Sequence, residues 1–579
     1  MVGYVALHWS EAVAPSALEP LRAVLARQSD WRIAVDVDSL LLAVRGPAWP
    51  RVRRLPAGRG WVVGDLFSRT FRPVADDEAD YLMISQACPA LEVAERLRDT
   101  YWGRYVALID PRRAAGGVYR DPSGAVDALT WRGGGVSITA AQCPAWMPPG
   151  LVPAVTFDWP EIGRWLVDGS APAVRSGLRS VRSVTPGAFA AFAGGERQVW
   201  RPSDYAQRPS VSAADAAAAL PDLLDQCVAA AIADAAGIAA EISGGLDSAI
   251  LASSLAPAGG ERVRHWFNYH AAEGSGDERA FARDVAARWG VRLTEVFRAP
   301  FRYDADLLEG GAFGLRPGFQ AFDAAADIDL ARRLAEAGCD RMVSGQGGDM
   351  ALFNIPTAVV VADHLRAKGL RGLSSPYVAD VARWTRQSVW RTLGQALKPG
   401  AAWWGEAKLH DHPWMAGASG LPPGKRAHIA IIAQKLTAHI ENRRSRQAEI
   451  LTPFLFQPIV EHCLAVPVPD LTAGGRERAL ARRAFAARLP VSVLERREKG
   501  EFSAFYHRVI ADSLPFLRGY LLDGELAGAG LIDTDRFDRL LTVENLIWHA
   551  DSAPIMAAAT AEAWVRCWRR RGAGSSPAS

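Results

Sequence analysis

The most informative stretch of the sequence is Glu241-Ile242-Ser243-Gly244-Gly245-Leu246-Asp247-Ser248-Ala249. The short apolar run from Ile238 to Ile242 predicts a strand, and a helix is expected to begin near Asp247. Two glycines between a strand and a helix let the backbone turn tightly and approach a ligand without a Cβ in the way. The helix start presents unpaired N–H groups and the positive end of its dipole. We therefore expect a phosphate loop made by Ile242, Ser243, Gly244, Gly245, Leu246, Asp247 and Ser248.

The acidic residue in this loop needs a separate explanation. A carboxylate that faces phosphates is repulsive unless a cation lies between them, so Asp247 is interpreted as a magnesium ligand. The loop is not a Walker A loop, because the lysine of G-x-x-x-x-G-K-[ST] is missing. A lone Ser-Gly-Gly would be an ordinary turn with an aspartate near the helix N-cap, but the full run Ser-Gly-Gly-Leu-Asp-Ser after a strand favours phosphate binding.

A second glycine-rich loop, Ser344-Gly345-Gln346-Gly347-Gly348-Asp349, follows the predicted strand Arg341 to Val343. In an open parallel sheet, ligands bind beyond the carboxyl ends of the strands. Two such loops are therefore expected to face one bound ATP, with Ser344 and Gly345 among its contacts. Asp349 would share the magnesium with Asp247. The alternative for Asp349 taken alone is a helix N-cap, and the pairing with the first loop counts against it.

The surrounding sequence predicts two domains. Up to residue 200, short strands such as Leu40 to Val44, Gly60 to Gly64 and Tyr105 to Asp110 alternate with turns. Residues 201–212 read as a linker. Beyond it, helices alternate with strands, which predicts an α/β domain with a parallel sheet. The expected boundaries are residues 1–205, residues 213–571, and a disordered tail over residues 572–579.

Within the second domain, individual elements can be predicted. A helix from Asp277 to Trp289 is bracketed by strands from Arg264 to Tyr269 and from Val291 to Phe297. A helix from Asp323 to Ala337 leads into the strand before the second loop. Residues 355–440 contain helical segments with several tryptophans and no strong strand signal.

Composition excludes several classes of protein. The net charge is +3 over 579 residues, so no bulk attraction to nucleic acid or to a membrane surface is expected. The six cysteines are scattered without a C-x-x-C pair, which argues against a zinc site or a disulfide scaffold and fits a reducing compartment. Neither a signal peptide nor a membrane span is recognisable. We expect a cytoplasmic protein with no nucleic-acid or membrane partner.

The two loops together resemble those of the asparagine synthetase family of PP-loop enzymes. The resemblance extends to other segments: Trp102 to Asp110, Tyr119 to Gly124, Asp277-Glu278 before the helix containing Ala282 and Val285-Ala286, Ala448 to Leu455, and Leu489-Pro490 followed by Arg497, Lys499-Gly500 and Phe502. It implies a degenerate glutaminase-like (Ntn-type) sandwich followed by a PP-loop parallel-sheet synthetase domain. It also implies ATP and Mg²⁺, and activation of a carboxylate as its adenylate with release of pyrophosphate.

Departures from the family pattern narrow the function. Glutamine-dependent members need Cys at position 2, but this chain has Val2, which cannot be a nucleophile. Gln346 stands where asparagine synthetase carries Glu and β-lactam-forming relatives carry Tyr, and an amide cannot accept a proton. Leu451 and Phe456 replace an Arg and an Asp near the Pro-Phe-Leu segment, which indicates a more apolar acyl pocket.

The remaining subgroup is that of the lasso peptide cyclases, which residues 457–461, 465–467 and 472–485 strongly resemble. This resemblance implies that the enzyme joins an Asp or Glu side chain of a leaderless core peptide to the peptide's N-terminal amine as a macrolactam. The implied partners are the precursor or core peptide, a leader-peptide protease and a leader-recognition protein.

The resemblance also assigns two catalytic candidates. Lys499 is expected to stabilise the oxyanion and the departing phosphate in acyl transfer, although by base rate it would be a surface lysine. Glu449 is a candidate proton acceptor, with the alternative that it pairs with Arg443 or Arg444. Aromatic walls for a peptide are expected from Trp384, Trp390, Trp403, Trp404 and Trp414, with core packing as the alternative for each.

Other functions stay open at this stage. A β-lactam-synthetase-like small-molecule amide ligase and a glutamine-independent asparagine synthetase relative share the same chemistry, and Gln346 counts against both. A non-catalytic scaffold that only binds a precursor peptide is opposed by intact Asp247, Asp349 and Lys499. A tRNA-modifying PP-loop enzyme would be expected to have a basic face and a reactive cysteine, and neither is apparent.

Overall fold

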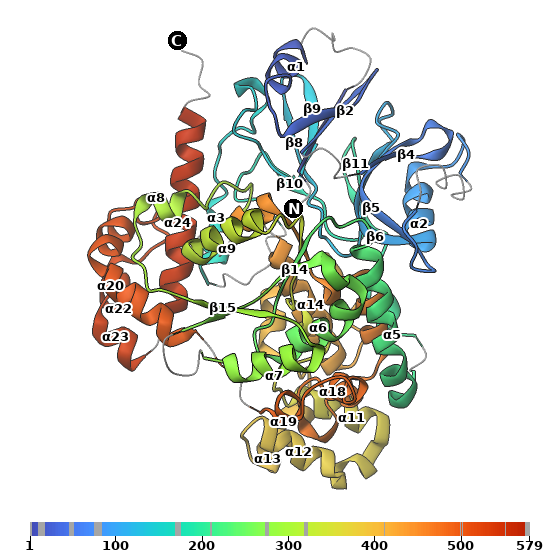
Figure 1. Cartoon of the computed structure of the whole chain (residues 1–579), viewed down its shortest axis with the longest axis vertical. Coiled ribbons are helices and arrows are strands. Elements are labelled where there is room, and N and C mark those ends of the chain that lie inside the picture. The colour runs from blue at the N-terminus through green and yellow to red at the C-terminus, as the bar shows by residue number, and fades with distance from the viewer. Residues whose placement is uncertain are drawn as a thin grey trace.

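The structure is a computed structural model. It describes residues 3–9, 18–45, 51–74, 84–167, 175–208, 211–271, 277–317, 322–409, 411–439, 441–497, 500, 502–549 and 552–573. The N-terminal strands lie together at one end of the molecule, and the parallel sheet with most of the helices lies below them in Figure 1.

Two six-stranded antiparallel sheets form the N-terminal part. The first has the order β10-β8-β9-β1-β3-β2 and the second β12-β11-β7-β6-β5-β4. Their strands are β1 (Tyr4–His8), β2 (Trp31–Val37), β3 (Leu40–Arg45), β4 (Val52–Arg54), β5 (Gly60–Ser68), β6 (Tyr101–Ile109), β7 (Gly117–Arg120), β8 (Leu129–Gly133), β9 (Val136–Ala140), β10 (Arg182–Ser183), β11 (Ala188–Ala191) and β12 (Glu196–Gln198).

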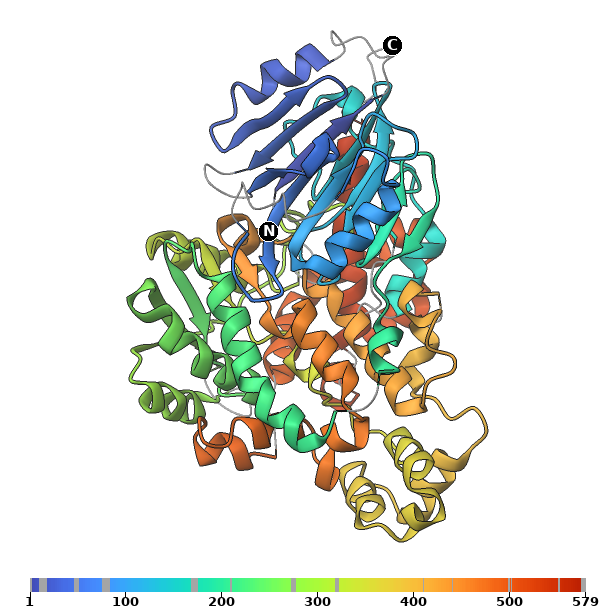
Figure 2. The same ribbon diagram turned by 90° about the vertical axis from the view of Figure 1, so that its right-hand side faces the viewer.

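The two sheets pack face to face because alternate side chains of each strand point into a shared core. Tyr4 and Ala6 of β1 meet Val106 and Leu108 of β6 in this core. The intervening Val5 and Leu7 point to the opposite face, where they join a cluster that includes the C-terminal helices. Figure 2 shows the two sheets side by side above the rest of the chain. The strands expected around residues 40–44, 60–64 and 105–110 are therefore confirmed.

A five-stranded parallel sheet forms the centre of the second part. Its order is β15-β14-β13-β16-β17, and every neighbouring pair is parallel. The strands are β13 (Ile238–Glu241), β14 (Val263–His270), β15 (Leu293–Phe297), β16 (Arg341–Val343) and β17 (Glu449–Leu451). Helices α5, α6 and α7 pack on one face, and α9 packs on the other through Leu330 and Leu334. The expected α/β domain is confirmed.

The helices have the following bounds: α1 (Glu19–Leu25), α2 (Ala90–Thr100), α3 (Trp159–Val167), α4 (Pro202–Ala206), α5 (Ala213–Ala231), α6 (Leu246–Gly259), α7 (Arg279–Trp289), α8 (Ala305–Glu309), α9 (Ala324–Glu336), α10 (Gly348–Ala351), α11 (Val359–Lys368), α12 (Pro376–Trp384), α13 (Val389–Leu397), α14 (Pro423–Lys435), α15 (Arg443–Gln447), α16 (Gln457–Ala465), α17 (Val468–Leu471), α18 (Ala479–Ala484), α19 (Val491–Glu495), α20 (Ser503–Leu522), α21 (Glu525–Gly528), α22 (Thr534–Leu540), α23 (Val543–Trp548) and α24 (Ser552–Ala573).

Two sequence expectations need correction. The expected linker contains a helix, α4, whose Ser203 and Tyr205 are buried, because Tyr205 stacks on Trp200 at the edge of a hydrophobic cluster. The tail was expected to begin at residue 572, but helix α24 continues through Gly572 to Ala573. Residues 574–579 lie outside the described residues.

The structure also bears on the cysteines and on membrane spans. All six cysteines are unpaired thiols, and five of them are buried. Among the described helices, none has the length and apolar character needed to cross a bilayer.

Candidate functional site

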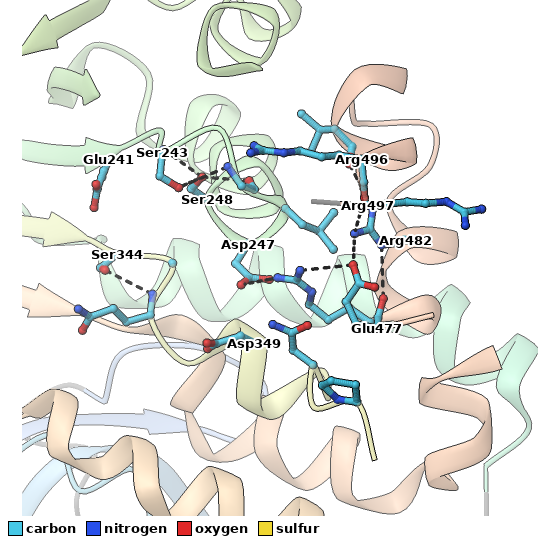
Figure 3. A pocket seen from close by; sticks show the side chains of 18 of the residues that line it. Glu241, Ser243, Asp247, Ser248, Ser344, Asp349, Glu477, Arg482, Arg496 and Arg497 are labelled. Carbon is cyan, nitrogen blue, oxygen red and sulfur yellow. Dashed lines mark hydrogen bonds and ion pairs between the residues drawn. The ribbon is translucent and has the colours of Figure 1, made fainter. Parts of the chain in front are cut away.

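Both glycine loops lie at the carboxyl ends of neighbouring strands. β13 and β16 pair directly in the centre of the sheet, and the loop after each one lines the same cavity of about 340 Å³ (Figure 3). Two kinds of charged side chain line it as well: the carboxylates of Glu241, Asp247, Asp349 and Glu477, and the guanidinium groups of Arg478, Arg482, Arg496 and Arg497. The structure therefore brings together the two loops that the sequence singled out.

The first loop turns as its glycines predict. Gly244 has φ +84°, and a Cβ there would lie 2.8 Å from the carbonyl oxygen of Glu278. The helix α6 begins at Leu246, close to the expected start. Ser248 Oγ lies 3.0 Å from Ser243 Oγ and accepts a hydrogen bond of 3.2 Å from the Ser243 amide. These bonds fix both hydroxyls at the edge of the cavity, beside the N-terminal turn of α6.

The second loop packs directly against the first. A Cβ on Gly345 would lie 3.0 Å from the Ser248 amide nitrogen, and a Cβ on Gly348 would lie 2.6 Å from the Asp247 carboxyl carbon. The glycines are therefore required where one loop touches the other, because any side chain would push the loops apart. This contact places Asp349, one residue beyond Gly348, on the same cavity as Asp247.

Asp247 is paired with an arginine that the sequence did not single out. Arg478 Nη1 lies 2.9 Å from Asp247 Oδ2 and 3.1 Å from Oδ1, an ion pair marked in Figure 3. Burial alone lowers the pKa of Arg478, but the neighbouring Asp247 and Glu477 carboxylates outweigh it, so the pKa is raised. The half-buried Asp349 carboxylate makes no hydrogen bond or ion pair with another described residue.

A third wall comes from residues 476–497. Arg482 Nη1 donates to the carbonyl oxygens of Val493 and Leu494 at 3.2 and 2.5 Å, which holds the end of α19. Arg496 Nη1 donates to the carbonyl oxygen of Gly244 at 3.1 Å and also pairs with Glu278. This wall is therefore hydrogen-bonded to the first loop itself.

Lys499 lies outside the described residues, and the nearest described residues on either side of it are Arg497 and Gly500. Arg497 lines the cavity, and the Gly500 amide donates a hydrogen bond of 2.6 Å to Glu278 Oε1. Glu278 holds Arg496 as well. The described residues nearest to Lys499 on both sides thus lie at the cavity or bind a residue that holds its wall.

The interpretation of Glu449 as a catalytic carboxylate is corrected by its position. Glu449 is the first residue of β17, so it lies at the amino end of the sheet, opposite the glycine loops. Its carboxylate is buried and pairs with Arg341 at 2.9 Å and with Arg104 of the N-terminal part. Burial raises the pKa of Glu449, and the two guanidinium groups oppose that shift. The structure thus makes it a buried ion-pair residue, although its partners are not the expected Arg443 or Arg444.

Leu451 and Phe456 are buried in the hydrophobic core and are not among the residues that line this cavity, so the apolar acyl pocket stays a prediction. The expected aromatic wall is found in part. Among the five tryptophans, only Trp384 lines the cavity. Trp403 and Trp414 are core residues, whereas Trp390 and Trp404 are 83% and 71% exposed.

Sequence reasoning missed the arginines that complete the site. Arg478 and Arg482 lie in the segment 472–485, which was noted only as a resemblance. Their one available signal was the density of arginines in Arg476-Glu477-Arg478-Ala479-Leu480-Ala481-Arg482-Arg483. A run of this kind is usually a solvated helix face, so only the fold shows that it turns inward.

Comparison with known proteins gives the family. The family model for asparagine synthase matches residues 219–566, which is more than half of the chain and includes both loops and the arginine wall. The site thus belongs to an ATP-dependent amide-forming ligase. The chain is a member of the asparagine synthase family.

Other comparisons add no argument about function. A search of curated proteins found no significant match. A solved structure of the allosteric regulatory enzyme of purine biosynthesis is 13% identical, covers 59% of this chain and 89% of its own, and has a TM-score of 0.21. Glutamine phosphoribosylpyrophosphate amidotransferase from B. subtilis, complexed with ADP and GMP, is 14% identical, covers 59% and 81%, and has a TM-score of 0.19. Such TM-scores establish no shared fold.

Proposed function

We propose that this enzyme is a lasso peptide cyclase. It activates an Asp or Glu side chain of a leaderless core peptide with ATP, and joins it to the N-terminal amine of the same peptide. The observation that carries the proposal is the position of Gln346, which lines the cavity between the two phosphate loops. An amide there cannot take a proton, so the site suits a nucleophile that needs no strong base.

The N-terminal amine of a peptide is such a nucleophile. Its ordinary pKa is about 7.7–8.0, so roughly a tenth of it is already neutral at pH 7. A side-chain amine of ordinary pKa near 10.4 would need a base far more. Because Glu449 lies at the other end of the sheet, the proton released after attack passes to a phosphate oxygen or to water.

The loops supply the groups that ATP requires. The hydroxyls of Ser243 and Ser248 and the first turn of α6 face the cavity and would hold the pyrophosphate portion. Asp247 and Asp349 would hold Mg²⁺, which is commonly bound through one or two carboxylates plus substrate phosphates. When bound, the ion neutralises charge that develops on the phosphates.

Arg478 has two alternative partners in this scheme. In the absence of nucleotide it neutralises Asp247. With ATP bound, the guanidinium would contact the phosphates and leave Asp247 to the metal, so that no carboxylate faces the phosphates without a cation. Lys499 acts afterwards, at acyl transfer, where a compact cation stabilises the tetrahedral oxyanion and the departing phosphate. A leader-peptide protease and a leader-recognition protein would deliver the substrate.

The proposal is tested with a synthetic leaderless core peptide, ATP and Mg²⁺. The expected product has lost one water and resists exopeptidase digestion, and one AMP and one pyrophosphate appear per ring. Asp247→Asn and Asp349→Asn should each abolish the product, whereas Asp306→Asn, an exposed carboxylate on α8, should leave it unchanged. Lys499→Ala should bind ATP normally yet form little product in a single turnover.

Three outcomes would replace the proposal. Amide formation on a small amino acid but not on any peptide would make the enzyme a small-molecule ligase. Asparagine formation from aspartate and ammonia would make it a glutamine-independent synthetase. Glutaminase turnover by the pure protein would contradict the inference from Val2.

A further inference from the structure

Helices α11, α12 and α13, with the 3-10 helix η7 (Gly369–Ser374), form a lobe that projects from the lower end of the molecule in Figure 2. We call residues 359–400 the basic lobe. It contains seven basic residues, Arg366, Lys368, Arg371, Arg383, Arg386, Arg391 and Lys398, and two acidic residues, Asp363 and Asp380. The whole chain has 66 basic and 63 acidic residues. The positive charge is therefore local to the lobe and not a property of the whole protein.

These cations are exposed and largely without partners. All seven basic side chains belong to exposed residues. Arg383 pairs with Asp380, but the other six make no hydrogen bond or ion pair with another described residue. Asp363 is buried and accepts hydrogen bonds from the Gly424 and Lys425 amides at 2.7 and 3.0 Å, and Arg366 is the lobe cation whose charge acts on its pKa.

Large apolar side chains are exposed among these cations. Trp390 is 83% exposed, Leu370 86% and Leu397 61%. Trp390, the half-buried Leu393 and Leu397 follow one another at helical spacing on one face of α13. Thr392 and Ala396 of the same helix are buried, and α13 packs on α11 and α12. An exposed tryptophan and exposed leucines in the same lobe as unpaired arginines are typical of a binding surface.

The basic lobe is attached to the wall of the catalytic cavity. Trp384, the last residue of α12, lines the cavity. The Tyr377 hydroxyl on the same helix hydrogen-bonds Thr472 Oγ1 at 2.6 Å. A Cβ on Gly475 would lie 2.3 Å from the backbone of Asp380, so the chain leading to Arg478 runs in direct contact with α12. A ligand on the lobe is thus close to the loop that pairs with Asp247.

We propose that the basic lobe binds an acidic segment of the substrate peptide that also carries apolar side chains and lies outside the ring-forming residues. This inference rests on the proposed function for the identity of the ligand. Arg386 and Arg391 would pair with its carboxylates, and Trp390 and Leu397 would pack on its apolar side chains.

Such a surface has a clear use in ring closure. Folding a peptide so that its amine reaches its own activated carboxyl has an entropic cost, and anchoring the rest of the chain on the enzyme offsets part of it. The contact between α12 and the cavity wall favours a peptide over a membrane, because only a ligand that reaches the cavity gains from this position. An anionic membrane remains the alternative to be measured.

The test uses the full chain and three probes of defined chemistry. One is a fluorescein-labelled 16-residue peptide that alternates Glu with Leu and Phe, the second has Gln at every Glu, and the third is a set of phosphatidylglycerol vesicles. The acidic peptide should bind with an affinity that falls as salt rises. The Gln peptide and the Arg386→Glu/Arg391→Glu variant should each show at least tenfold weaker binding. Trp390→Ala should show about fivefold weaker binding, because it removes the largest exposed apolar side chain.

A matched variant separates the lobe from net charge. Arg27→Glu/Arg197→Glu makes the same charge change at two exposed positions of the N-terminal part, one in the turn after α1 and one on β12, and should bind the acidic peptide like the parent. Equal weakening in this control and in the lobe variant, or no weakening in either, would overturn the proposal. Binding to vesicles but not to the peptide would overturn it in favour of a membrane.

A turnover measurement distinguishes this failure from failure of the proposed function. With a core peptide that is cyclised, the lobe variant should raise KM at least tenfold with kcat nearly unchanged, whereas an unchanged KM would remove the lobe from substrate binding. If no peptide is cyclised but the acidic probe still distinguishes the variants, the proposed function fails and the binding surface stands.

Discussion

At the scale of single residues, Arg478 is the arginine that neutralises Asp247 in the cavity. Four carboxylates and four arginines line it, but Arg482 is bound to backbone carbonyls and to Glu477, and Arg496 is bound to Gly244 and Glu278. Arg478 pairs with Asp247 instead. Its backbone has φ +53°, a left-handed conformation that a non-glycine residue rarely adopts. The fold thus holds this residue in an uncommon conformation at the point where phosphates would bind.

Replacement of Arg478 by Met should lower both catalysis and stability, because it removes the phosphate contact and leaves the buried Asp247 carboxylate without its ion-pair partner. Met keeps much of the length but loses the charge, and removal of one preorganised donor to a developing charge typically lowers the rate about 10²–10³-fold. Arg478→Lys should recover part of the rate. The measurement is single-turnover formation of AMP with a core peptide. Arg483→Met, which changes an exposed arginine one residue beyond Arg482, should stay near the parent rate. Equal rates for Arg478→Met and Arg483→Met would exclude Arg478 from phosphate binding.

At the scale of elements, the two loops act as one unit. β13 and β16 are short and central, and in an open parallel sheet a ligand binds beyond the carboxyl ends of the strands, where these two loops meet. The glycines lie at the contact: Gly345 faces the Ser248 amide and Gly348 faces the Asp247 carboxylate. Each loop therefore sets the position of the other.

This contact predicts a strong effect for a single methyl group. In Gly348→Ala the new Cβ would lie 2.6 Å from the Asp247 carboxyl carbon, so the carboxylate or the second loop must move. We expect AMP formation to fall at least 100-fold, with the melting temperature within a few degrees of the parent. Gly519→Ala is the control, because a Cβ there meets nothing within 4 Å. In a helix interior that change should add up to about 1 kcal/mol of stability. Normal turnover by Gly348→Ala would show that the loops do not need this contact.

The loops could be predicted from sequence because their signals are local. A short apolar strand, two glycines and a helix start all lie within the 12 residues from Ile238 to Ala249, and strand-end geometry then predicted that the second loop would face the first. The helix expected from Asp277 to Trp289, found as α7 (Arg279–Trp289), was predictable for the same reason, since its periodicity is written in consecutive residues.

The parts that sequence could not predict depend on distant partners. Glu449 reads as one more acidic residue next to arginines, and its actual partner Arg104 lies 345 residues away. Strand β17 has three residues, too few for an alternating pattern to mark it as a strand, so the sequence did not show that Glu449 begins it. The five tryptophans looked alike in sequence, yet in the structure one lines the cavity, two are buried in the core and two are exposed at the surface. Such differences arise only when the elements pack.

At the scale of the whole molecule, a buried ion cluster joins the two parts of the chain. Arg104 on β6 pairs with Asp65 on β5 at 2.5 Å and with Glu449 on β17. Glu449 pairs in turn with Arg341, the first residue of β16, at 2.9 Å. All four side chains are at most 8% exposed. The N-terminal sheets are thus bound by charge to the two strands nearest the second loop.

Strands β16 and β17 are short enough to transmit a displacement from one end to the other. β16 and β17 have three residues each, are paired in register, and end where the Ser344 amide donates to the Leu451 carbonyl oxygen at 2.9 Å. Three residues of strand span roughly 10 Å. A shift of Glu449 is therefore carried to the start of the second loop with little chance to relax. The N-terminal part, whose Val2 cannot act as a nucleophile, would thus have a structural role. It would fix the strands that carry the second glycine loop.

A double-mutant cycle on Arg104 and Glu449 tests this connection. Breaking a buried pair leaves an uncompensated charge, which typically costs about 3–5 kcal/mol. Arg104→Met and Glu449→Gln should each lower the free energy of unfolding by an amount of that order. The double variant should lower it by clearly less than the sum of the two, because each single change leaves the other group buried without its partner. Urea unfolding gives the energies, and ATP affinity should weaken in parallel with them. The exposed pair Arg332–Glu336 on α9 is the matched control, where the same cycle should give a coupling below about 1 kcal/mol. Additive effects at Arg104 and Glu449, or single variants that lose stability but bind ATP like the parent, would show that the cluster holds the two parts together without positioning the loop.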